Sequence, residues 1–294
     1  MKALRTPADL RQALESLGRG PIIGFVPTMG AFHDGHVALF RAARQECDVV
    51  VASVFVNPSQ FSDPADFAAY PRDRSRDEGV AAASGIDLLF VPSVDDMYPP
   101  GHATWVDVQG PARGLESDFR PGHFRGVATI CAKLFDIVRP DVVFLGQKDA
   151  QQVAVIKQLV RDLNLDLAIR VIPTVRAADG LALSSRNVGL SADDRTRALA
   201  LPRALAAGQA AYLEGRDVVA AARAELAGLE IDYVAVADFE GQPTLAIAAR
   251  VGATRLIDNV PLEASREPHE TPAGDRVVSS KESGHDQQAA FRRT

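Results

Sequence analysis

Two histidines, His33 and His36, lie three residues apart in the stretch FVPTMGAFHDGHVALFRAARQ (25–45). A strand-like run precedes them and a helix-like run follows, so both are expected at a helix N-terminus, where free amides and the helix dipole favour an anion. Side chains three residues apart share one helix face, so both imidazoles can reach one phosphate. Gly35 leaves room for a ligand near the backbone. The stretch indicates a phosphate site; the alternative is a tight turn with two surface histidines.

A second candidate phosphate site is the stretch FLGQKDAQQ (144–152), which again reads as a strand end, a glycine and a helix start. Lys148 supplies a cation where a phosphate would lie, and Asp149 can accept hydrogen bonds from ribose hydroxyls. Gln152 is expected on the same helix face as Lys148 and Asp149. The alternative, a helix cap beside a solvated charge, carries about equal weight from this stretch alone.

Two further stretches carry polar side chains in turns. In FVNPSQF (55–61), Asn57 and Pro58 predict a turn after which Gln60 offers both a donor and an acceptor. The segment DGLALSSRN (179–187) places two serine hydroxyls and Arg186 on a flexible connector that could close over phosphates. The alternatives are a solvated loop glutamine and a plain linker.

The stretch RPGHFRG (120–126) adds Arg120, His123 and Arg125, either as a phosphate-facing patch or as a solvated basic turn. The sequence has no GxxxxGK[ST] and no GxGxxG with a following acid, so it predicts neither a P-loop nor an ordinary dinucleotide fold. It also lacks GxSxG, which argues against covalent acyl chemistry. The candidate site therefore has phosphate-binding groups and no evident nucleophile.

The elements that must position these residues alternate between short apolar strands and longer helices. Five buried strands are predicted, at 21–26, 48–56, 87–91, 141–146 and 167–173. Helices are predicted at 123–138 and 150–163, where apolar residues recur at three- and four-residue spacing. This alternation indicates an α/β fold, a Rossmann-like doubly wound parallel sheet covered on both faces. Such sheets bind ligands at the carboxyl ends of their strands.

The pattern changes after about residue 188. Two helices are predicted at 191–215 and 217–229, the first with Ser191 as its N-cap, and strands at 231–240 and 249–260. We therefore predict a nucleotide- and substrate-binding domain at 1–187 and a second, smaller α+β C-terminal domain at 188–262. A polar tail at 263–294, without a pattern of its own, is expected to be disordered.

Composition narrows the class of protein. The chain of 294 residues has a net charge of -6, which argues against a general nucleic-acid or membrane-surface binder. Its two cysteines, Cys47 and Cys131, are far apart and lie in no metal-binding motif. The first residues are charged and carry no apolar signal segment, and the sequence has no run of membrane-spanning length. We expect a cytoplasmic protein.

Taken together, these stretches resemble a known family. PTMGAFHDGH, FVNPSQF, YPRD, RPGHFRGV, GQKDAQQ, ADGLALSSRN and TRLIDN match, in order and spacing, the pattern of the pantothenate synthetase (pantoate–β-alanine ligase) family from about residue 2 to 260. That family belongs to the nucleotidyltransferase superfamily, in which HxGH corresponds to the HIGH motif. The resemblance implies ATP-dependent condensation of (R)-pantoate with β-alanine, giving pantothenate, AMP and diphosphate through a pantoyl-adenylate.

The resemblance also implies roles for residues of this sequence. His36 would be the proton-donating group, acting with His33, Lys148 and Arg186, while Gln60 would bind pantoate and β-alanine and Gln152 pantoate. The residues implied at the ATP site are Met29, Gly30, Ala31, Phe32, His33, Asp34, Gly35, His36, Gly146, Gln147, Lys148, Asp149, Val175, Leu183, Ser184, Ser185 and Arg186. Mg²⁺ would accompany ATP, with protein ligands that the sequence does not identify, and a homodimer is implied.

Two residues depart from the family pattern. Ser59 replaces the methionine common before the glutamine, and Phe32 replaces the leucine common before the first histidine. Two other functions are weighed against the ligase. One is a nucleotidyltransferase that moves AMP or CMP onto a phosphorylated acceptor, which would require more cationic groups at the acceptor. The other is a catalytically silent nucleotide-binding regulator, which the retained histidines and Lys148 disfavour.

Overall fold

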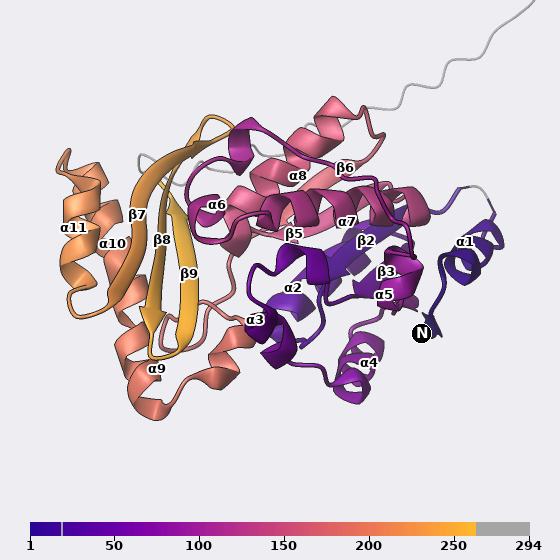
Figure 1. The fold of residues 1–294 in the computed structure, drawn as a ribbon, viewed down its shortest axis with the longest axis horizontal. Coiled ribbons are helices and arrows are strands. Elements are labelled where there is room, and N and C mark those ends of the chain that lie inside the picture. The colour runs from indigo at the N-terminus through magenta and orange to yellow at the C-terminus, as the bar shows by residue number, and fades with distance from the viewer. Residues whose placement is uncertain (19, 263–294) are drawn as a thin grey trace, which may run out of the picture. The chain divides into compact units, whose positions relative to one another are not determined.

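The strand runs at the start of the chain form a six-stranded parallel sheet, with the spatial order β1-β4-β3-β2-β5-β6 (Figure 1). Its strands are β1 (Lys2–Leu4), β2 (Ile23–Thr28), β3 (Val49–Val54), β4 (Leu88–Phe90), β5 (Val142–Gly146) and β6 (Ala168–Ile172). The computed structural model describes residues 1–18 and 20–262, so the predicted tail at 263–294 lies outside the described residues. Strand β1, which pairs with β4, was not predicted because three residues are too short to show a period.

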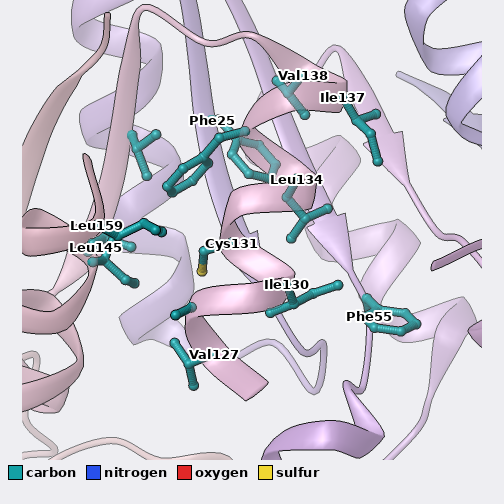
Figure 2. Close-up of a cluster of buried hydrophobic side chains, with 14 of the residues drawn as sticks. Phe25, Phe55, Val127, Ile130, Cys131, Leu134, Ile137, Val138, Leu145 and Leu159 are labelled. Carbon is teal, nitrogen blue, oxygen red and sulfur yellow. The ribbon is translucent and has the colours of Figure 1, made fainter. Parts of the chain in front are cut away.

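Helices cover both faces of this sheet, since neighbouring strand residues point to opposite sides. On one face Phe25, Val51 and Val143 pack against helices α1, α7 and α8; on the other, Val26 and Val50 pack against α2 and α4. Figure 2 shows part of the first cluster, with α7 residues beside Phe25, Phe55 and Leu145. The helices of this part are α1 (Pro7–Glu15), α2 (Asp34–Glu46), α3 (Pro64–Ala69), α4 (Arg74–Ala83), α5 (Val94–Met97), α6 (Glu116–Phe119), α7 (His123–Val138) and α8 (Ala150–Asp162).

A second, antiparallel sheet of three strands follows in the chain, with α10 and α11 packed on one side of it (Figure 1). Its elements are α9 (Ala192–Ala198), α10 (Ala200–Leu213), α11 (Val218–Glu225), β7 (Glu230–Phe239), β8 (Gln242–Val251) and β9 (Thr254–Pro261). Four short 3-10 turns complete the described chain: η1 (Pro58–Gln60), η2 (Gly110–Ala112), η3 (Gln147–Asp149) and η4 (Ser185–Gly189). The predicted fold class is confirmed.

Two predictions within this second part were wrong in detail. The helix expected at 191–215 is interrupted at Leu199, because Pro202 has no N–H to donate to the carbonyl of Ala198. The strand expected at 249–260 is a hairpin joining β8 to β9, and it turns at Gly252, whose φ is +58°. The start of β8 was missed because its small, alanine-rich residues give a weak strand signal.

Within residues 1–18 and 20–262, every helix is too short or too polar to pass through a bilayer.

The order of the first sheet matters more for function. The chain runs from β2 outward to β3 and β4, then returns to β5 on the other side of β2. The carboxyl ends of β2 and β5 therefore meet at the point where the strand order reverses, and this is where doubly wound sheets bind ligands.

Candidate active site

A cavity of about 240 Å³ opens at the carboxyl ends of the central strands. Residues that follow β2, β3, β5 and β6 line it, because parallel strands deliver their ends to one edge of the sheet. Fourteen of the nineteen residues that the resemblance assigns to ATP or substrate lie on its wall: Met29, His33, Gly35, His36, Gln60, Gly146, Lys148, Asp149, Gln152, Val175, Leu183, Ser184, Ser185 and Arg186. Segments far apart in the chain therefore meet at one site.

The turn between β2 and α2 is held from behind by Asp77 of α4. The carboxylate of Asp77 accepts hydrogen bonds from the amides of Ala31 (2.9 Å) and Phe32 (2.7 Å). Gly30 has φ +81°, and a Cβ there would lie 2.7 Å from an Asp77 oxygen, so only glycine allows the turn to approach so closely. This anchor directs the following histidines toward the cavity.

His33 and His36 cap the helix that they begin. The Nδ1 atom of His33 accepts from the amide of Gly35 at 3.1 Å, and the Nδ1 atom of His36 accepts from the amide of His33 at 3.3 Å. Each ring therefore carries its hydrogen on Nε2. Burial lowers the pKa of His33 to about 4, with help from the Lys148 charge, and burial lowers the pKa of His36 to about 3. Both histidines are neutral hydrogen-bond donors near pH 7.

Lys148 and Asp149 come directly after β5, in η3. Their side chains lie 3.8 Å apart, the ammonium mostly buried and the carboxylate half exposed. The backbone of this turn is held by Asn259 of β9, whose Nδ2 donates to the carbonyls of Gln147 (3.0 Å) and Lys148 (2.7 Å). The second sheet thus positions the only lysine among the residues that line the cavity.

The connector that carries Ser184–Arg186 lies against the histidine turn. The Oγ atom of Ser185 donates to the carbonyl of Ala31 at 3.3 Å, and the Oγ atom of Ser184 accepts from the amide of Arg186 at 3.3 Å. The Arg186 guanidinium is paired with Asp66 of α3 at 2.8 Å and remains about one-third exposed. A phosphate that reaches Arg186 would therefore compete with Asp66 for it.

Five residues named for the ATP site do not line the cavity: Gly30, Ala31, Phe32, Asp34 and Gln147. Phe32 points into the core and packs edge-on against Phe40, which explains why a large apolar residue is accepted at this departure from the family pattern. The side chain of Gln147 donates to Asn259, and Asp34 is exposed at the start of α2. These residues support the lining from behind or beside it.

The structure adds lining residues that the sequence left undecided or did not single out. The sequence left open whether Arg120, His123 and Arg125 face a phosphate or form a solvated turn. Arg120 and His123 both line the cavity, whereas the guanidinium of Arg125 lies 4.7 Å from the centre of the Trp105 ring. Burial lowers the pKa of His123 to about 4, so it is neutral too. Asn57 was interpreted only as a turn residue, and Tyr70 was not singled out, although it lies in the quoted YPRD motif.

Part of the cavity wall is apolar. It is formed by Val127, Ile130, Cys131 and Leu134 of α7 together with residues of β5. Burial raises the pKa of the Cys131 thiol to about 12, so Cys131 stays protonated and is no nucleophile. Among the described residues, His, Cys, Asp and Glu form no cluster of three or more that could hold a metal ion. The cavity thus combines hydrogen-bond donors and cations with an apolar pocket.

Comparisons with known proteins point to one family. The family model described as pantoate-beta-alanine ligase matches residues 2–261. A pantothenate synthetase of Moorella thermoacetica is 49% identical over 90% of this chain and 100% of its own length, and one of Geobacter sulfurreducens is 46% identical over 88% and 98%.

Solved structures give the same result. The pantothenate synthetase of Thermus thermophilus superimposes with a TM-score of 0.84 at 43% identity, covering 89% of this chain and 99% of its own. The pantoate-beta-alanine ligase of Francisella tularensis, solved as a complex with beta-gamma ATP and beta-alanine, has a TM-score of 0.80 at 37% identity, covering 90% and 99%. The chain belongs to the pantoate-beta-alanine ligase family.

Proposed function

We propose that this chain condenses (R)-pantoate with β-alanine at the expense of ATP, forming pantothenate, AMP and diphosphate through a pantoyl-adenylate. One observation carries the proposal: a single cavity joins hydrogen-bond donors and cations suited to phosphates with an apolar, amide-containing pocket. A carboxylate that attacks phosphorus is itself the nucleophile, so the protein need only align the reactants and stabilise charge. The ATP and β-alanine bound to the Francisella relative fit this assignment.

The charged end of the cavity suits the triphosphate. The Nε2–H groups of His33 and His36 can donate to phosphate oxygens without carrying charge themselves. Lys148 supplies the positive charge, and Ser184, Ser185 and Arg186 approach from the connector. Without a bound phosphate, burial lowers the pKa of His36 to about 3, so His36 is neutral and offers its Nε2–H as a hydrogen-bond donor.

The other end of the cavity suits pantoate. Its hydroxyl and carboxylate oxygens need hydrogen bonds, which Gln60 and Gln152 can supply without adding charge. Its gem-dimethyl group needs an apolar wall, which Val127 and Ile130 of α7 provide. Arg120, which also lines the cavity, offers a cation to the pantoate carboxylate before it reacts.

The chemistry then takes two steps. A lone pair of the pantoate carboxylate forms a bond to the α-phosphorus while the bond from that phosphorus to the bridging oxygen breaks, and diphosphate leaves with the electron pair. The neutral amine of β-alanine next attacks the acyl carbon, the amide C–N bond forms, the C–O bond to AMP breaks, and the amine loses a proton. Enclosure of the adenylate protects this mixed anhydride from water between the two steps.

The substrate is expected to be the Mg²⁺ complex of ATP. Mg²⁺ bound to phosphates commonly uses only one or two protein carboxylates and keeps several waters. The carboxylate of Asp149, half exposed beside Lys148 on the cavity wall, could be such a ligand. The described residues form no cluster of three or more His, Cys, Asp or Glu side chains that would hold the ion without the phosphates. The homodimer, the cytoplasmic location and the domain division near residue 187 stay predictions.

Exchange of labelled diphosphate into ATP, measured with Mg²⁺ and without β-alanine, tests the first step. Exchange that requires pantoate, followed by pantothenate formation when β-alanine is added, supports the proposal. Transfer of the nucleotide to a phosphorylated alcohol instead of pantoate would favour the other nucleotidyltransferase. Binding of ATP without any product from pantoate, with or without β-alanine, would contradict the ligase assignment.

A further inference from the structure

A partly buried hydrogen-bond network adjoins Gln60 and reaches the cavity wall at Asn57. It joins the hydroxyls of Tyr98 and Ser59 to the side chain of Asn57, which in turn contacts Gln60. The Oδ1 atom of Asn57 is 2.9 Å from the Tyr98 hydroxyl and 2.9 Å from the Ser59 hydroxyl, and these two hydroxyls are 2.9 Å from each other. The mechanism described above uses neither Tyr98 nor Ser59.

Two backbone groups and two hydroxyls together determine which way the Asn57 amide faces. Its Nδ2 atom lies 3.1 Å from the carbonyl of Gly126, which can only accept a hydrogen bond. Its Oδ1 atom lies 3.3 Å from the amide N–H of Ser59, which can only donate. The two hydroxyls add donors on the same oxygen side. Asn57 is only 1% exposed, so a reversed amide would leave several buried groups without partners.

The orientation of Asn57 sets that of Gln60. The second hydrogen of the Asn57 amide donates to Oε1 of Gln60 at 3.0 Å. The Oε1 atom is thereby engaged by Asn57, and Nε2 donates to the sulfur of Met29, a residue that lines the cavity, at 3.1 Å. A thioether is a weak acceptor, so these N–H groups are available for a stronger one.

Tyr98 is held firmly enough to transmit this orientation. Its ring stacks on Trp105 at 6.1 Å between centroids, and the ammonium of Lys133 lies 5.7 Å from its ring centre. Burial raises the pKa of Tyr98, so the phenol keeps its hydrogen for Asn57 or Ser59. Ser59 is the position at which this sequence departs from the methionine of the family pattern, so its hydroxyl is a contact that methionine does not offer.

We propose that Tyr98 and Ser59 are positioning residues: through Asn57 they orient the Gln60 amide so that it presents N–H donors, and no acceptor, to the substrate. The inference rests on the proposed function in taking pantoate as that substrate. It follows that Gln60 binds an oxygen of pantoate and does not accept a hydrogen bond from the ammonium form of β-alanine. The resemblance implies that Gln60 binds both pantoate and β-alanine; with this orientation, its side chain binds only groups that accept a hydrogen bond.

The first test removes the hydroxyls. Tyr98→Phe, alone and with Ser59→Ala, is expected to raise the KM for pantoate about 5-fold, the size of one loosened hydrogen bond, and to leave the KM for ATP unchanged. Thr129→Val is the matched control, since it also removes one buried hydroxyl of this region, bonded to Val106, and does not line the cavity. An equal change in both KM values, or an effect no larger than that of the control, would overturn the proposal.

A double-mutant comparison separates positioning from general packing. If Tyr98 acts through Gln60, adding Tyr98→Phe to Gln60→Ala changes the KM for pantoate no further. If the two effects multiply, Tyr98 acts by another route and the proposal fails. Wild-type protein assayed in parallel gives an independent check, because a failure of the proposed function would appear there as no pantothenate formation at all.

The second test probes the donor itself. In Gln60→Glu, one carboxylate oxygen can still accept from Asn57, and the other faces the cavity as an acceptor. We expect this variant to bind pantoate at least about 10-fold more weakly than Gln60→Ala, because two acceptors then oppose each other. Calorimetry with pantoate measures this without turnover. Tighter binding by Gln60→Glu than by Gln60→Ala would mean that an acceptor faces the substrate, which contradicts the proposal.

Discussion

Gly126, in the first turn of α7, allows that helix to approach η1 closely enough to hold Gln60. A Cβ built at Gly126 would lie 2.4 Å from the carbonyl oxygen of Ser59 and 2.7 Å from the amide nitrogen of Gln60. Both atoms belong to the backbone, so no side chain can rotate away. The substitution Gly126→Ala therefore requires the turn and the helix to separate by about 1 Å to restore ordinary contact.

Three contributions determine the effect on stability. Alanine is favoured over glycine inside a helix by about 1 kcal/mol. Overpacking costs about 1–3 kcal/mol, and weakening the bond from Asn57 to the Gly126 carbonyl costs about 1 kcal/mol more. We expect the free energy of unfolding to fall by about 1–3 kcal/mol. Because Gln60 moves with the turn, turnover of pantoate should fall by up to about 100-fold.

Urea unfolding and pantothenate formation, each compared with wild type, measure the two effects. Gly79→Ala is the matched control: it lies inside helix α4, and a Cβ there would have no neighbour within 4 Å. It should stabilise the protein by up to about 1 kcal/mol and leave activity unchanged. If Gly126→Ala behaved like Gly79→Ala in both assays, the close approach of helix and turn would not control the position of Gln60.

The remaining predictions concern charge. His36→Ala and Lys148→Ala should each lower kcat about 100-fold or more, as expected for a lost preorganised donor or cation; near-wild-type rates would remove both from the phosphate site. Arg255→Met should cost about 3–5 kcal/mol of unfolding free energy, because it leaves the buried carboxylates of Glu116 and Asp232 without their shared partner. Arg250→Met is the control: Arg250 lies across the hairpin from Arg255 and pairs with the exposed Glu230, so its loss should cost less than about 1 kcal/mol. Equal losses of unfolding free energy in the two variants would contradict this prediction. Since the folded pKa of His123, about 4, lies below its unfolded value of 6.5, the unfolded state binds the extra proton first, and acidification from pH 7 to pH 4 should destabilise wild type by about 3 kcal/mol more than His123→Gln. Parallel pH profiles of unfolding free energy would refute it.

Local sequence patterns determined much of the fold and the outline of the site. The three- and four-residue spacing in HFRGVATICAKLFDIV predicted helix α7 at the bounds that the structure shows, His123–Val138. The change from strand to helix around HDGH predicted that His33 and His36 would begin a helix, and they do. These features depend on neighbouring residues only, so they can be deduced from the sequence. A parallel sheet covered on both faces followed from the general rule for alternating strands and helices, whereas the order of its strands came from the structure.

The tertiary structure alone decided which distant residues meet and how burial changes their chemistry. Nothing local predicts that Asn259 of β9 holds the turn at Lys148, or that Tyr98 reaches Asn57, because partners far apart in the chain leave no periodic signal. Arg120 and Arg125 both lie in the stretch RPGHFRG, and the sequence does not distinguish them. Packing brings only Arg120 to the cavity, whereas Arg125 lies over the ring of Trp105. Burial likewise makes His36 a neutral donor, since removing water disfavours the charged imidazole.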